Sequence, residues 1–266
     1  MIKNVMKQKL LFDSKGKPMR VACFMSGSGT NVRKIIEHQM KLKEKSPYKV
    51  VVIFTDDPES NAKVITKEYR IPFVLNDIKE FYDGRDIKDM SIRREYDKKT
   101  AELIEPFKPD IIALGGYAWV VTEPLFSKYL IVNVHPADLS VTENGKRKYV
   151  GLHDAPPRKA ILAGEESLHS STHIVTKNVD QGEVLVISKP LKVELPEGIT
   201  LEDLKKPENK ELLKNIAKEH QNKLKELGDW KIFPLTLEWI AEGRFAIDEN
   251  RKIYFDGKLV ENGYRL

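Results

Sequence analysis

At residues 20–31 the chain reads RVACFMSGSGTN, an apolar strand pattern that runs directly into a glycine-rich turn. Apolar residues then recur at Val32, Ile35 and Ile36, which is the spacing of a helix. A strand, a glycine turn and a helix in this order are typical of α/β domains, in which helices cover a parallel sheet. The glycine turn is therefore predicted at the carboxyl end of the first strand of such a sheet.

The rest of the chain repeats this alternation up to about residue 150. Further strands are predicted at residues 49–54, 72–75, 110–115 and 130–135, with helices at residues 60–69, 91–107 and 123–128. Strands that are apolar on both faces and alternate with helices favour an α/β fold with a doubly wound, mostly parallel sheet.

After residue 150 the pattern changes. Strands at residues 171–176 and 184–193 are close in sequence, and we expect them to pair antiparallel at the edge of the sheet. The remaining predicted elements are helices at 155–163, 210–227 and 235–242 and a small hairpin over 245–255 around Asp256-Gly257, a hairpin turn signal. We expect residues 1–18 to be an N-terminal extension and residues 19–195 to form the catalytic domain. Residues 196–266 are expected to form C-terminal helices and a hairpin packed on the same domain.

Composition limits the class of protein. Of 266 residues, 41% are hydrophobic and 32% are charged, which is typical of a soluble globular chain. The net charge of +5 comes from lysines that alternate with acidic residues, so a solvated surface accounts for it better than nucleic-acid binding. No apolar run approaches roughly 20 residues, and no signal peptide is recognisable. Cys23 is the only cysteine, which excludes an intramolecular disulfide and a cysteine-based zinc site.

From these limits we expect a cytoplasmic protein. Small-molecule substrates and a monomer or homodimer are also expected, although composition alone does not establish them. Neither a nucleic acid nor a membrane is expected as a partner.

The glycine turn has the features of an anion site. Glycines let backbone N–H groups converge, the helix N-terminus adds free donors, and Ser28, Thr30 and Asn31 add side-chain donors around Gly29. Val32 occupies the position of the third glycine in a dinucleotide-binding motif, and no Gly-Lys-Ser/Thr follows. The turn is therefore predicted to bind a single phosphate, or else to be only a tight capped connection.

Three polar residues are candidates for proton chemistry. Asn133 and His135 are two apart at the end of a predicted strand, so their side chains point to the same face. That end of a parallel sheet is where open α/β folds bind ligands. An amide can stabilise an oxyanion and an imidazole can move a proton. Asp180, which precedes Gln181-Gly182 between two strands, is either a turn residue or the carboxylate that orients His135.

Together these features resemble the folate-dependent formyltransferase family. The matching segments are Met25–Asn31, Asn133–Pro136, Gly151–His153, Ser171–Thr176 and Asp180–Leu185, in the family's order and spacing. The resemblance extends over residues 19–193 and is weaker beyond. It implies a formyltransferase-like variant of the Rossmann fold.

The resemblance also implies a reaction. The primary amine of a phosphorylated acceptor would attack the formyl carbon of 10-formyltetrahydrofolate, and no metal would take part. Asn133 and protonated His135 would stabilise the oxyanion, while Asp180 would support His135 and help to relay the proton. The first expectation for the acceptor is 5-phosphoribosylglycinamide, an intermediate of purine biosynthesis, held through its phosphate by Ser28, Gly29, Thr30 and Asn31.

Further site residues follow only from the resemblance. His153 and His173 are candidates to line the site. The expected folate-binding residues are Arg93, Tyr117, Ala118, Trp119, Val120, Val121 and Val175.

The chain also departs from the family. The run after His135-Pro136 is longer and basic at residues 140–150, Trp119 replaces a family arginine, and Asp229 stands where the family often has glutamate. These departures leave the acceptor open. An amino sugar nucleotide as acceptor, or a non-catalytic relative that binds a nucleotide or folate, are the alternatives.

Overall fold

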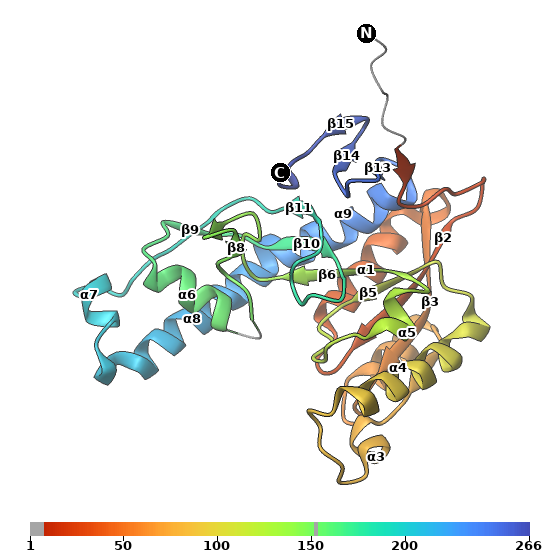
Figure 1. The fold of residues 1–266 in the computed structure, drawn as a ribbon, viewed down its shortest axis with the longest axis horizontal. Coiled ribbons are helices and arrows are strands. Elements are labelled where there is room, and N and C mark those ends of the chain that lie inside the picture. Colours follow the sequence, from red (N-terminus) through yellow and green to blue (C-terminus); the bar gives the residue numbers. More distant parts are fainter. Residues whose placement is uncertain (1–7, 152–153) are drawn as a thin grey trace.

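The structure is a computed structural model that describes residues 8–151 and 154–266. Its centre is an eight-stranded sheet in the order β16-β11-β10-β6-β5-β2-β3-β4 (Figure 1). Five neighbouring strands run parallel: β2 (Met19–Met25), β3 (Tyr48–Thr55), β4 (Phe73–Leu75), β5 (Ile111–Leu114) and β6 (Leu130–His135). The doubly wound, mostly parallel sheet expected from the sequence is confirmed.

The other strands of this sheet come from the second half of the chain. Strand β10 (Ser171–Ile174) pairs antiparallel with β6, and β11 (Val184–Ile187) pairs antiparallel with β10, as predicted. Their expected place at the edge is wrong, because β16 (Tyr264–Arg265) adds a parallel strand outside β11. All residues of β11 are buried, as is common for a strand with neighbours on both sides.

The predicted strand at 184–193 is also interrupted. Residues near its end form β12 (Leu191–Lys192), which leaves the central sheet and pairs with β9 (Ser167–Leu168). Pro190, which has no backbone N–H, stands between the two parts.

Helices α1 (Thr30–Leu42), α2 (Ala62–Tyr69) and α9 (Trp230–Ala241) cover one face of the sheet, and α3 (Ile78–Tyr82), α4 (Met90–Ile104) and α5 (Glu123–Phe126) cover the other. Helices α6 (Ala155–Leu162), α7 (Leu201–Leu204) and α8 (Lys210–Leu224) instead pack on one another to the side of the sheet (Figure 1). Short 3-10 turns lie at Lys43–Lys45, Glu105–Phe107 and Pro207–Asn209. On one face, Val132 and Val134 of β6 share a core with α1 and α9. Ile131 packs on the opposite face with α4 and α5. Because side chains alternate along a strand, Asn133 and His135 point to the α4–α5 side.

The long helix in Figure 1 corrects a predicted boundary. Helix α8 continues through a π-helical turn at Lys225–Asp229 into α9, whereas the sequence predicted a new helix from residue 235. Pro234 lies inside α9 rather than before it. A proline lacks the N–H that would bond four residues back, so the irregular turn just before it accommodates the broken pattern.

A small second sheet, ordered β1-β13-β14-β15, joins the first strand of the described chain to three strands that follow α9. Its strands are β1 (Lys9–Leu10), β13 (Phe245–Ile247), β14 (Ile253–Phe255) and β15 (Lys258–Leu259). The expected pairing of 245–247 with 253–255 is confirmed, but Asp256-Gly257 turns β14 into β15 instead. Both residues have positive φ, 49° and 75°, which suits a two-residue hairpin turn.

The basic run after His135 also has a defined structure. Residues 142–147 form a short hairpin of β7 (Thr142–Glu143) and β8 (Lys146–Arg147) that turns at Asn144-Gly145. Within the described residues, no helix is both long and apolar enough to span a membrane.

Candidate active site

The register of the sheet brings three polar side chains together. His173 on β10 lies directly opposite Asn133 on β6, and Ser171 lies opposite His135. Cross-strand partners project to the same face, so the amide and both imidazoles share one surface at the carboxyl end of β6. This is the edge at which the sequence predicted a site.

His135 is buried, with 3% of its surface exposed, and a polar group faces each of its ring nitrogens. Its Nε2 lies 2.8 Å from the carbonyl oxygen of Tyr149, so that nitrogen carries a proton. Its Nδ1 lies 3.7 Å from Oδ1 of Asp180. Burial lowers the pKa of His135, while the Asp180 carboxylate opposes the shift. The ring is therefore neutral near pH 7, with the lone pair of Nδ1 facing the carboxylate.

His173 orients the amide of Asn133. Its Nδ1 lies 3.0 Å from the carbonyl oxygen of Ile174 and must donate, which leaves Nε2 as an acceptor. Nδ2 of Asn133 donates to that Nε2 at 3.2 Å. Burial lowers the pKa of His173, so the neutral ring that this pattern requires is favoured. Asn133 retains a second N–H for another acceptor.

Asp180 reaches this group from the loop between β10 and β11. One carboxylate oxygen lies 3.7 Å from both Nδ1 of His135 and Nε2 of His173, and the other accepts from the backbone N–H of Gly151 at 3.3 Å. The side chain is only 9% exposed. Side chains from β6, from β10 and from the loop after β10 thus form one cluster.

A small cavity borders the cluster on the α4–α5 side. Its volume is about 80 Å³, the room of a few water molecules. It is lined by Leu114, Tyr117, Ala118, Trp119, Val120, Val121, Asn133, His173, Val175, Thr176, Val179 and Asp180. Six of the seven residues expected to bind folate are in this lining, so the structure brings them together with Asn133 and Asp180. A larger ligand would need the walls to move.

Arg93 is placed differently. It lies behind the cavity wall, 3% exposed, where it donates to the carbonyl oxygen of Val120 and the hydroxyl of Tyr117 and pairs with Asp97 at 3.0 Å. Its guanidinium also lies over the ring of Trp119. The structure therefore gives Arg93 a supporting position under the 117–121 loop, outside the lining.

Sequence reasoning missed Asp56, which joins the two expected binding loops. Its carboxylate accepts from the Ser26 hydroxyl at 2.5 Å and from the indole N–H of Trp119 at 2.6 Å. Ser26 in turn accepts from the backbone N–H of Ala118. Burial raises the pKa of Asp56, and the two donors oppose that shift. The available signal was its position directly after β3, at the same edge of the sheet.

The glycine turn precedes α1 as predicted. Gly29 has φ of +68°, and no side chain caps the helix N-terminus, so its first N–H groups stay available. The buried Oδ1 of Asn31 has no hydrogen-bond partner within the described residues. The side chain of Asn31 also forms a hydrogen bond with the carboxylate of Asp229. That carboxylate accepts a second hydrogen bond from the Ser170 hydroxyl at 2.5 Å. Burial raises the pKa of Asp229 to about 6.

The two remaining expectations from the sequence concern His153 and metal binding. His153 lies outside the described residues. Across residues 8–151 and 154–266, no group of three or more His, Cys, Asp or Glu side chains is arranged to hold a metal ion.

An open α/β sheet with an amide, an imidazole and a carboxylate near its carboxyl edge is typical of α/β enzymes that move a proton during group transfer. Residues 19–214 match the Formyl transferase family. The chain belongs to this family, and it is an enzyme that uses 10-formyltetrahydrofolate as co-substrate.

Named relatives agree with this assignment. The chain is 26% identical to phosphoribosylglycinamide formyltransferase of Haemophilus influenzae, over 92% of this chain and 98% of the relative. It is also 26% identical to the Escherichia coli protein of the same name, again over 92% and 98%. The solved structure of phosphoribosylglycinamide formyltransferase from Coxiella burnetii shares the fold at a TM-score of 0.68 and 20% identity, over 94% of this chain and all of the other.

Proposed function

We propose that this formyltransferase acts on 5-phosphoribosylglycinamide, transferring the formyl group of 10-formyltetrahydrofolate to its primary amine. The observation that carries the proposal is the buried cluster of Asn133, His135 and Asp180, which offers an oxyanion donor beside a proton acceptor. The relatives that cover nearly the whole chain bear this activity in their names.

The cluster supports a definite division of roles. As the amine nitrogen bonds to the formyl carbon, the carbonyl oxygen becomes an oxyanion, and the second N–H of Asn133 would donate to it. Neutral His135 would accept a proton released by the attacking amine at Nδ1. The imidazolium formed in this way would be stabilised by Asp180 and by the carbonyl of Tyr149, and would then add to the oxyanion stabilisation.

Collapse of the tetrahedral intermediate completes the transfer. The bond between the formyl carbon and N10 of the folate breaks, and that nitrogen receives the proton that the amine lost. Asp180 would assist this transfer through water, because its carboxylate lies between the imidazole and the cavity. No proton or electron pair is left over in this scheme.

The two substrates would approach from opposite sides of the cluster. We assign the folate ring to the cavity walled by Tyr117–Val121 and Val175, and the acceptor phosphate to the turn Ser28–Asn31. Asp229 and the unpaired oxygen of Asn31 would face the acceptor ribose. The reaction proposed needs neither nucleic acid nor membrane and is consistent with a cytoplasmic monomer or homodimer.

A panel assay tests the proposal. The purified full chain is mixed with 10-formyltetrahydrofolate and, separately, with 5-phosphoribosylglycinamide, an amino sugar nucleotide, dephosphorylated ribosylglycinamide and water alone. We expect rapid formyl transfer to the first acceptor, at least about 10²-fold above the dephosphorylated analogue, since a phosphate held by charge-assisted hydrogen bonds adds several kcal/mol. Transfer to the sugar nucleotide alone would replace the acceptor, and hydrolysis alone would replace the reaction.

Gly29→Ala tests the phosphate turn. An added Cβ would lie 2.5 Å from Cδ1 of Ile65 and 2.6 Å from Cε of Met25, at a backbone φ that L-residues rarely adopt. We expect the free energy of unfolding to fall by about 1–2 kcal/mol and the acceptor KM to rise about tenfold, with the folate KM nearly unchanged.

Gly27→Ala is the matched control, because an added Cβ there meets no atom within 4 Å. Thermal unfolding and steady-state kinetics of both variants decide the result. An equal rise of both KM values in Gly29→Ala would mean that the turn serves only the fold.

A further inference from the structure

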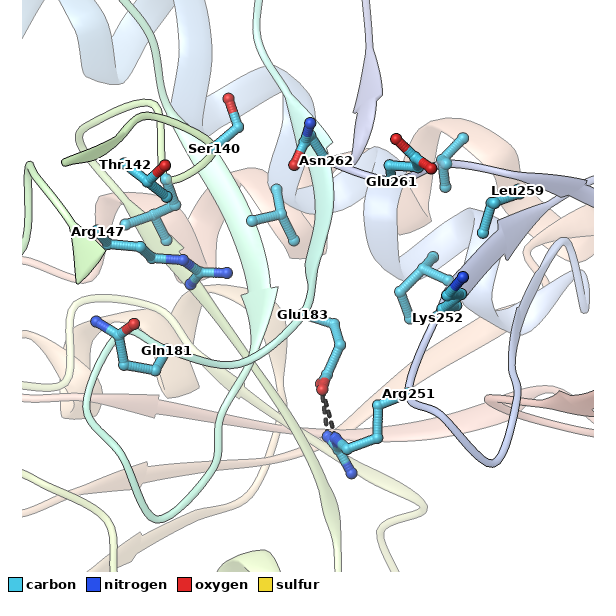
Figure 2. Close-up of a pocket in the computed structure, with 14 residues that line it drawn as sticks. Ser140, Thr142, Arg147, Gln181, Glu183, Arg251, Lys252, Leu259, Glu261 and Asn262 are labelled. Carbon is cyan, nitrogen blue, oxygen red and sulfur yellow. Dashed lines mark hydrogen bonds and ion pairs between the residues drawn. The ribbon is translucent and has the colours of Figure 1, made fainter. Parts of the chain in front are cut away.

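The loop that carries Asp180 is contacted from outside by the hairpin after His135. Arg147, on β8, donates from one guanidinium nitrogen to the carbonyl oxygen of Asp180 and from the other to that of Gly182, the latter at 2.7 Å. Arg147 also lines a cavity of about 390 Å³. Figure 2 shows Arg147 on one wall of this cavity, with Arg251 and Lys252 of the C-terminal segment on the opposite wall.

The loop needs an external support because its backbone is unusual. Asp180 has a φ of +55°, which is uncommon for a residue with a side chain. Gly182 is pressed against β10 so closely that any Cβ there would overlap the carbonyl oxygen of Ile174. Backbone conformations of this kind persist where the surroundings over-determine them. The forked guanidinium of Arg147 binds the carbonyl oxygens of Asp180 and Gly182, the residues on either side of Gln181.

We propose that Arg147 is a positioning residue, which holds the carboxylate of Asp180 against His135 by binding the carbonyl oxygens of Asp180 and Gly182. This inference rests on the proposed function and deepens it, because it assigns a catalytic purpose to the basic hairpin that departs from the family pattern. Arg147 acts through the loop and touches neither substrate.

The charges around His135 make this role separable from a purely electrostatic one. Facing the imidazole are Asp180, which raises its pKa, and Arg147 and Lys159, which lower it. The ring of His173 and the carbonyl of Tyr149 complete its surroundings. Lysine at position 147 would keep the positive charge but could not bridge two carbonyl oxygens as a planar fork does. A fall in the pKa of His135 in Arg147→Lys would therefore report withdrawal of the Asp180 carboxylate.

The experiment compares Arg147→Lys with the wild type in the full chain. We expect kcat to fall at least about tenfold with both KM values within about threefold, since a displacement near 1 Å at a catalytic group can cost ~10²-fold. NMR titration of the His135 ring, without substrate, should show a lower pKa. Lys146→Gln is the control, because this exposed neighbour on the same strand points away from the loop, and it should keep both values.

A second variant tests the contact itself. Arg147→Ala should lose at least as much kcat and should recover part of it, about fivefold, when guanidinium chloride is added at concentrations that leave the wild type folded and unaltered. The neighbouring cavity gives the ion access to the vacated position. Recovery with guanidinium but not with ammonium at equal ionic strength would support fork-like binding to the two carbonyl oxygens.

Each result bears on the inference. Unchanged kcat together with an unchanged pKa of His135 in Arg147→Lys would overturn it, as would rescue of Arg147→Ala by ammonium and guanidinium alike. If the wild type transfers no formyl group but Arg147→Lys still lowers the pKa of His135, the proposed function is refuted. The positioning role of Arg147 then still stands.

Discussion

Replacing His135 with alanine is expected to lower kcat at least about 10²-fold while the protein still folds. The substitution removes a neutral ring whose open nitrogen faces both Asp180 and the attacking amine in the proposed reaction. It also leaves the carbonyl of Tyr149 without its 2.8 Å partner, at a cost of about 1–3 kcal/mol. That cost is smaller than the usual stability of a domain, so loss of activity would report chemistry.

Single-turnover formyl transfer, with thermal unfolding alongside, measures this effect. His38→Ala is a suitable control, because His38 lies on α1 and pairs with Glu238 at 2.8 Å, away from the cluster. It should keep kcat within about twofold, because the contact that it removes is partly exposed and lies on another element of the fold. Activity of His135→Ala close to wild type would remove His135 from the mechanism.

The pH dependence follows from the lowered pKa of His135. A base must be unprotonated to act, so kcat/KM should rise with pH through a value below 6.5, the ordinary pKa, and then level off. The rise should be absent from the residual activity of His135→Ala. A rise centred above the ordinary value would mean that protonated His135 is favoured in the free enzyme.

The central sheet could be predicted from the sequence because its strands are apolar on both faces, a pattern typical of parallel strands covered by helices on either side. The carboxyl edge followed from chain direction, so Asn133, His135 and the glycine turn could be placed together. The two-residue strand β16 could not be predicted, since so short a segment has no periodicity. The sequence predicts the start of α9 too late, because a proline such as Pro234 usually precedes a helix or stands in its first turn.

The supporting residues of the site were hidden for a different reason. Arg147 lies in a basic run that is normally interpreted as solvated surface, and its contacts depend on how two loops fold against each other. Asp56 looks like one of several turn carboxylates until Trp119 and Ser26 are seen to donate to it. The family resemblance directs Arg93 toward the folate, but the rings of Tyr96 and Tyr117 hold its guanidinium behind the wall.

Asp180→Asn should lower kcat by about 10²-fold or more while leaving the loop in place, because asparagine keeps the shape of the side chain and removes only its charge. The imidazolium that forms on His135 would then lose its carboxylate at 3.7 Å. The pKa of His135 should fall further, since Asp180 opposes the effect of burial. Kinetics and NMR titration of the ring measure both effects.

Asp138→Asn serves as the control for this variant. Asp138 accepts from Arg265 at 2.8 Å and from Ser140, close to β6 but without contact to His135, so its loss should change kcat by less than about threefold. Wild-type kcat and an unchanged pKa of His135 in Asp180→Asn would show that the carboxylate takes no part.

Combining the two loop substitutions separates charge from position. If Arg147 acts only by placing the carboxylate of Asp180, then Arg147→Lys should reduce kcat strongly in the wild type but hardly at all once Asp180→Asn has removed that charge. Residues that act as a unit are non-additive in this way, whereas independent contributions multiply in rate. A double variant whose loss in kcat equals the product of the two single losses would mean that Arg147 acts on the reaction by a route that does not pass through Asp180.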